Sequence, residues 1–101
     1  MNGASYRFTF ANATDRSEAE STLLLSVYAI EGLYGRARVR LDANYAVDAE
    51  HNAILVDSSN EIGAAIVGVF TNLILRELGE EAFDVHPLNQ PLGAQAAEKA
   101  A

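Results

Sequence analysis

The chain has 101 residues, of which 50% are hydrophobic and 21% are charged. This length suits one domain, and the apolar content is too high for an intrinsically disordered chain. Seven basic and 14 acidic residues give a net charge of −7, which disfavours binding to nucleic acid or anionic membranes unless the positive charge is segregated. The absence of cysteine excludes disulfides, thiolate metal sites and a cysteine nucleophile.

We expect neither an export signal nor a membrane-spanning segment in this sequence. Residues 1–10 lack the basic start and the continuous apolar run of a secretory signal. The longest uncharged stretch, residues 62–75, is shorter than the roughly 20 apolar residues that a membrane-spanning helix needs. We therefore expect a cytoplasmic protein, with one domain over residues 1–88 and a flexible, polar and alanine-rich tail over residues 89–101.

The first two predicted elements are a strand and a helix. Tyr6, Phe8 and Phe10 alternate with polar residues, which is typical of a strand with one buried face. The segment Asp15–Glu18 has the spacing of a capping box and precedes an apolar stretch that stops near Gly32. This stretch predicts the first helix.

The strictest alternation in the chain covers residues 36–47. Apolar residues occupy every second position from Ala37 to Val47, and arginine or another polar residue alternates with them from Arg36 to Asn44. This pattern predicts a strand with one face in solvent. Turn-forming residues follow at 48–52, and an apolar run resumes at 53–56, so we expect the two strands to form a hairpin.

The remaining pattern predicts one more helix and one more strand. Ser58–Glu61 repeats the capping-box spacing before a helix over residues 62–78, and Gly79 is placed to end it. Phe83–His86 can close the sheet as the last strand. The resulting βαββαβ order is the split βαβ arrangement of ferredoxin-like domains. It predicts a four-stranded antiparallel sheet with two helices on one face, strands one and three being central.

The second predicted helix is apolar on both sides. No charge interrupts it between Ile62 and Leu75, although the sheet can cover only one of its faces. The first helix and the tail could cover the other face within a monomer, or a second copy could cover it in a homodimer. We favour the homodimer, because small residues at helical spacing allow close approach of another backbone. The predicted interface consists of Leu24, Tyr28, Ala64, Val67, Gly68, Thr71 and Leu75.

Arginines form a stripe on the predicted second strand. The alternation places Arg36 and its neighbours on the sheet face that the helices leave open. Arginine suits phosphate and carboxylate ligands, but charges on an edge strand also prevent aggregation. If the stripe is functional, the open face binds a small molecule or an anion, or carries a small enzyme site. The predicted ligand-binding residues are Arg7, Arg38, Arg40, Asp42, Asp84 and His86.

One short segment resembles a known RNA-binding motif. Gly32-Leu33-Tyr34-Gly35 is similar to the GxxG loop of KH-type domains, and the resemblance covers these four residues only. That family places a helix after the second glycine, whereas here the strand-like alternation begins at Arg36. We interpret the segment as a helix end followed by a turn, and RNA binding is a minor alternative.

No motif indicates catalysis. His51 and His86 have no partners at metal-ligand spacing, and no serine lies in a nucleophile motif. We predict no catalytic residue, metal or cofactor. The favoured hypothesis is a non-catalytic, homodimeric protein-interaction or regulatory module.

Overall fold

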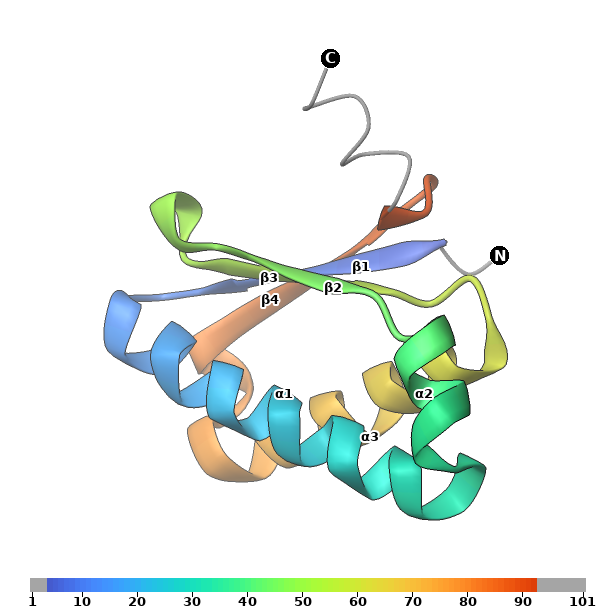
Figure 1. The fold of residues 1–101 in the computed structure, drawn as a ribbon. Helices are drawn as coiled ribbons and strands as arrows, with labels where there is room; N and C mark the ends of the chain where they lie inside the picture. Colours follow the sequence, from blue (N-terminus) through green and yellow to red (C-terminus); the bar gives the residue numbers. More distant parts are fainter. Residues whose placement is uncertain (1–3, 93–101) are drawn as a thin grey trace.

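The computed structural model describes residues 4–92 as an α+β domain built on a four-stranded antiparallel sheet. The three α-helices lie on one side of the sheet (Figure 1). The strands are β1 (Ser5–Phe10), β2 (Tyr45–Asp48), β3 (Ala53–Asp57) and β4 (Phe83–Leu88). The α-helices are α1 (Ala13–Tyr34), α2 (Arg36–Asp42) and α3 (Glu61–Leu78). The short 3₁₀ helices are η1 (Ala49–His51) and η2 (Glu80–Ala82).

The sheet agrees with the predicted α+β class and with the four predicted antiparallel strands. The spatial order is β2-β3-β1-β4, so β1 and β3 occupy the centre and β2 and β4 form the edges. Tyr6 and Phe8 lie opposite Val56 and Ile54, and all four side chains belong to the core or pack against it. The alternating aromatics of β1 therefore face the helices, as their period of two predicts.

The prediction of a single strand over residues 36–47 is wrong. Residues 36–42 form α2, and only Tyr45–Asp48 form the strand β2. Gly35 separates α2 from α1. Its φ is +90°, a value that residues with a Cβ atom rarely adopt. The turn at Gly35 lets the chain continue as a second helix, which buries Val39 in the core.

The helix ends differ in detail from the predicted caps. Asn12 and not Asp15 is the N-cap of α1, and Asn60 caps α3. Each asparagine side chain accepts a hydrogen bond from the backbone N–H three residues later. At the other end of α3, Gly79 adopts a φ of +85° and donates its N–H to Leu75, which confirms the predicted stop.

The core lies between the sheet and the two long helices. Phe8 of β1 meets Phe70 of α3 edge to face, with ring centroids 4.8 Å apart. Helices α1 and α3 pack side by side, and the Thr22 hydroxyl donates to the Glu77 carboxylate between them. The buried core residues are Phe8, Phe10, Ala19, Leu23, Val27, Ile30, Val39, Ile54, Val56, Ile62, Ile66, Phe70, Ile74 and Phe83.

The chain continues after β4 back onto the end of β3. The N–H of Leu92 donates to Asp57 Oδ2 at 3.2 Å, and the Leu92 side chain is buried. Of the predicted tail, residues 93–101 lie outside the described residues. Within residues 4–92, none of the helices combines the length and apolar character that spanning a bilayer requires.

Candidate functional site

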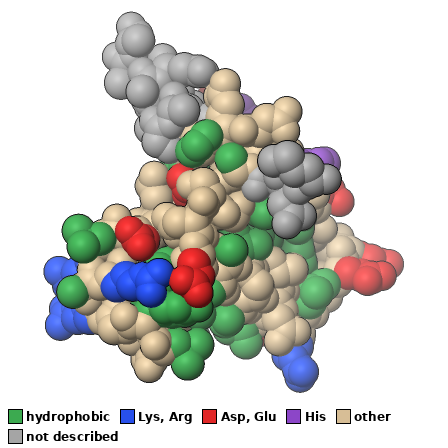
Figure 2. Space-filling model, turned by 90° about the vertical axis from the view of Figure 1, so that its right-hand side faces the viewer, with side chains coloured by type: hydrophobic (Ala, Val, Ile, Leu, Met, Phe, Trp, Pro, Cys, Tyr) green, Lys and Arg blue, Asp and Glu red, His purple; other side chains and the backbone are tan. Residues whose placement is uncertain are grey.

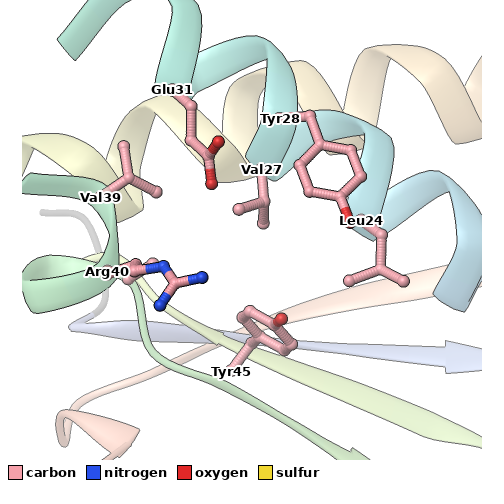
Figure 3. Close-up of a pocket in the computed structure, with 8 residues that line it drawn as sticks. Leu24, Val27, Tyr28, Glu31, Val39, Arg40 and Tyr45 are labelled. Carbon is pink, nitrogen blue, oxygen red and sulfur yellow. The ribbon is translucent and has the colours of Figure 1, made fainter. Parts of the chain in front are cut away.

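A pocket of about 300 Å³ opens between α1, α2 and the edge strand β2. Apolar and aromatic side chains form most of its wall, and Tyr28 of α1 and Tyr45 of β2 approach it from opposite sides (Figure 3). Such an apolar lining with few polar groups is typical of binding sites. The lining residues are Leu24, Val27, Tyr28, Glu31, Val39, Arg40, Ala43 and Tyr45.

Two charged side chains of opposite sign enter this pocket. Glu31 reaches in from α1, and Arg40 extends across from α2 (Figure 3). Neither histidine lines the pocket. The pocket can therefore hold an apolar group whose polar ends carry hydrogen-bond donors or acceptors, but it offers no imidazole for proton transfer.

The pocket continues along β2 as a shallow groove. A second hollow of about 100 Å³ shares Leu24 and Tyr45 with the first and adds Glu20, Leu23 and Val47. We call the two together the α1–β2 groove. It follows the edge strand because β2 is the outermost strand on this side of the sheet.

Exposed apolar side chains surround the groove. Leu24 and Tyr28 of α1 and Tyr45 and Val47 of β2 line it and are themselves exposed. Beyond it, large apolar residues stand in solvent at the end of α1 and on α2. Leu33 is 77% exposed and Leu41 is 85% exposed. Exposed apolar side chains gathered along one groove, as Leu24, Tyr28, Tyr45 and Val47 are, mark interaction sites.

The predicted interface residues do not form one surface. Leu24 and Tyr28 line the groove on the β2 side of α1. Ala64, Gly68 and Leu75 are exposed on α3, where Val67 and Thr71 are half-buried. Because α1 also packs against α3 through Thr22, the helix stands between the two sets.

The predicted ligand-binding residues are likewise divided, which corrects the proposed arginine stripe. Arg38, Arg40 and Asp42 lie on α2 and not on the open sheet face. The period-two pattern that placed them there does not hold in a helix, where successive side chains are rotated by about 100°. Arg7, Asp84 and His86 do lie on the strands β1 and β4.

Acidic partners neutralise the charge of Arg38. Its guanidinium lies 2.9 Å from Glu61 Oε1 and 3.8 Å from Asp42 Oδ2, and it also stacks over the Tyr34 ring. Seen from the α2 side, basic side chains lie directly beside acidic ones (Figure 2). This end of the molecule therefore presents mixed charge and no continuous basic patch.

A small polar cluster occupies the open sheet face. Arg7 lies 3.4 Å from Asp48 Oδ2, and His51 Nδ1 lies 2.9 Å from the same oxygen. Burial opposes ionisation of Asp48, but the hydrogen bond and charge of His51, together with the charge of Arg7, outweigh it and lower the pKa of the carboxyl group. The hydrogen bonds of this cluster join a guanidinium, a carboxylate and an imidazole.

A helix does follow the GxxG segment. Helix α2 begins at Arg36, directly after the second glycine, so the expected absence of a following helix is wrong. The segment is not a loop, however, because Gly32, Leu33 and Tyr34 are the last residues of α1. Gly35 alone interrupts the helical geometry.

Of the eight residues that line the pocket, the sequence indicated Leu24, Tyr28 and Arg40 as site residues, and the other five were missed. Val39 and Ala43 carry the i, i+4 spacing of a helix face, which could have indicated that they share one side. The strand-like alternation of the same segment concealed this signal. No cluster of three or more histidine or acidic side chains that could hold a metal occurs among residues 4–92.

Comparison with known proteins identifies no relative. No family model, no curated protein and no solved structure matches this chain. Its function is therefore argued from the geometry and chemistry of the groove.

Proposed function

We propose that this protein is a non-catalytic, homodimeric interaction module of ferredoxin-like topology, and that it associates through the α1–β2 groove. One observation carries the proposal. Of the nine large hydrophobic residues exposed within residues 4–92, four line the groove, whereas Leu25, Leu33, Leu41, Leu75 and Val85 do not. The four are Leu24 and Tyr28 of α1 and Tyr45 and Val47 of β2, so the groove gathers more exposed large apolar side chains than any other surface among these residues.

A macromolecular partner suits this surface better than a small ligand. The groove is open along β2, where Tyr45 and Val47 are exposed, so a small molecule would leave much apolar surface in water. Protein interfaces bury such surface with aromatic residues near the centre, as Tyr28 and Tyr45 would be here.

The small-residue stripe of α3 is the competing dimer face. Ala64 and Gly68 of this stripe are exposed, and Leu75 is the only large apolar side chain exposed on α3. A Cβ atom added at Gly68 would meet nothing within 4 Å, so the glycine has no packing role within the monomer. The groove offers more apolar area, and we therefore place the interface there.

A matched pair of charge substitutions tests the proposal. Tyr28→Lys places a charge in the groove, and Leu75→Lys places one on α3, both at positions exposed in the monomer. We expect a dimer for the native chain and for Leu75→Lys, and a monomer for Tyr28→Lys. Sedimentation equilibrium over a range of concentrations measures this, with circular dichroism to verify folding.

Two outcomes would contradict a homodimer that forms through the α1–β2 groove. Dissociation by Leu75→Lys alone would move the interface to α3. A native chain that stays monomeric at all concentrations, up to the high micromolar range of weak dimers, would remove the homodimer altogether.

Single-stranded RNA is the second candidate partner. The arrangement of α1, Gly35 and the arginine-containing α2 beside an apolar groove supports it. Glu31 within the pocket and the net charge of −7 oppose it. Fluorescence anisotropy with labelled RNA oligonucleotides tests it, since phosphate binding weakens steeply with salt and with Arg40→Ala. No binding at low salt removes this candidate.

A further inference from the structure

The two edges of the sheet are built differently. The edge strand β4 contains Asp84, His86 and Pro87, and both charged side chains and proline discourage a further strand from pairing. The edge strand β2 has the sequence Tyr45-Ala46-Val47-Asp48, with one charge at its end and no proline. By these criteria β4 is protected against pairing and β2 is not.

The hydrogen-bond pattern shows which backbone groups of β2 point outward. The N–H of Asp57 donates to the Asn44 carbonyl oxygen at 2.8 Å, so this pair belongs to the ladder between β2 and β3. Hydrogen-bonding residues alternate along an antiparallel strand. Ala46 therefore bonds toward β3, and the N–H and C=O groups of Tyr45 and Val47 face away from the sheet.

The proline of β4 lies at an outward-facing position of that strand. The N–H of Ala11 donates to the Ala82 carbonyl oxygen at 3.1 Å, so alternate residues beginning at Ala82 bond toward β1. Val85 and Pro87 consequently face outward. Proline has no N–H, so the outer edge of β4 lacks a donor at that position.

The outward backbone groups of β2 belong to residues with exposed apolar side chains. Tyr45 lies opposite Val56 and Val47 lies opposite Ile54, and residues directly opposite each other point to the same sheet face. Since Val56 and Ile54 are core residues, Tyr45 and Val47 point to the helix side, where both line the groove.

We propose that β2 pairs antiparallel with β2 of a second copy, with Tyr45 opposite Val47 of that copy and Ala46 on the two-fold axis. The proposal rests on the homodimer proposed above and specifies its geometry. The two Tyr45–Val47 pairs exchange four N–H···O=C hydrogen bonds. The two sheets join into one sheet of eight strands, whose helices all lie on the same face.

The side chains and the charges of β2 are compatible with pairing to β2 of a second copy. The register pairs an aromatic with a β-branched residue, which is a favourable cross-strand combination. It places Asp48 opposite Asn44 of the other copy, so no like charges lie opposite each other within the strand pair. The grooves of the two copies, with the exposed Leu24 and Tyr28 side chains, then lie on the same face of the joined sheet, one on each side of the axis.

A disulfide tests the register directly. In this pairing the two Ala46 residues form a non-hydrogen-bonded pair with Cα atoms about 4.5 Å apart, which a disulfide can bridge. The chain has no cysteine, so any disulfide of Ala46→Cys must join two copies. Ala64→Cys, on the exposed side of α3, is the matched control. We expect a covalent dimer of Ala46→Cys after mild oxidation, and none of Ala64→Cys.

The outcomes separate this inference from the function on which it rests. A native dimer that cross-links through Ala64→Cys and not through Ala46→Cys overturns the β2 pairing but keeps the homodimer. A native mass equal to one chain, with no cross-linking of Ala46→Cys, overturns both.

A pair of proline variants adds a test without cysteine. Val47→Pro removes the outward N–H of β2, and Val85→Pro does the same on β4, at two valines of similar exposure, 41% and 37%. We expect Val47→Pro to weaken dimerisation on the order of tenfold or more, because two intermolecular hydrogen bonds are lost by symmetry. Val85→Pro should leave the dissociation constant unchanged. Equal effects of the two variants would contradict pairing through β2.

Discussion

Val39 and Leu41 are two residues apart, yet Val39 is 1% exposed and Leu41 is 85% exposed. In a strand, residues at this spacing share a face. In α2 they point in different directions, so Val39 enters the core and Leu41 stands in solvent. We expect Val39→Ala to lower the free energy of unfolding by about 2 kcal/mol, and Leu41→Ala to change it by less than about 0.5 kcal/mol.

Urea denaturation followed by circular dichroism measures both variants. All samples need one protein concentration, because dimerisation shifts apparent stability. Equal losses of unfolding free energy from both substitutions would indicate that residues 36–42 form a strand and not the helix α2.

The same segment shows where sequence reasoning failed. Arg36, Arg38 and Arg40 alternate with apolar residues, and this local pattern fits a strand better than a helix. Tertiary packing decides the conformation of this segment. Gly35 turns the chain, and a short helix then buries Val39 against α1 and the sheet. Helix propensity and the period of the hydrophobic pattern are weak predictors of a seven-residue helix that is stabilised by packing.

Elements with longer or clearer patterns were predictable. The aromatics Tyr6, Phe8 and Phe10 identified the central strand β1, and Gly79 identified the end of α3. The candidate site was only partly predictable, because its walls come from Leu24, Val39 and Tyr45, which meet only after the turn at Gly35. A pattern read along the chain cannot indicate a pocket formed by three separate elements.

Gly35 is required by its backbone conformation. Its φ of +90° and ψ of 145° lie in a region that residues with a Cβ atom seldom adopt. We expect Gly35→Ala to destabilise the fold by about 1 to 3 kcal/mol. Gly32→Ala is the control, because Gly32 is helical and a Cβ there meets nothing within 4 Å. It should raise stability by up to about 1 kcal/mol. A neutral Gly35→Ala would show that the turn between α1 and α2 is not strained.

Gly63 is required for a different reason, the close approach of two backbones. A Cβ atom at this position would lie 2.0 Å from the carbonyl oxygen of Asp57, so α3 would have to move away from the end of β3. We expect Gly63→Ala to cost about 1 to 3 kcal/mol in thermal or urea unfolding. Gly68→Ala, in the same helix but with open space around it, should stabilise by about 0.5 to 1 kcal/mol. Similar effects at both glycines would disprove the close contact.

Asp48 couples the stability of the fold to pH. Burial opposes its ionisation, but His51 and Arg7 together lower the pKa of Asp48 below its ordinary value of 3.8. A carboxyl group with a lowered pKa in the folded state stabilises the fold above the unfolded pKa, and this stabilisation is lost as the pH falls through the folded pKa. We expect Asp48→Asn to be less stable than the native chain at pH 7.

The difference between the two proteins should shrink as the pH falls below about 4 and vanish once Asp48 is protonated. Urea unfolding between pH 7 and pH 3, at one protein concentration, measures it. Asp84→Asn is the control on the same sheet face, because Asp84 takes part in none of the ion pairs among residues 4–92. A stability difference for Asp48→Asn that stays constant over this range would show that the contacts to His51 and Arg7 do not favour the ionised carboxylate in solution.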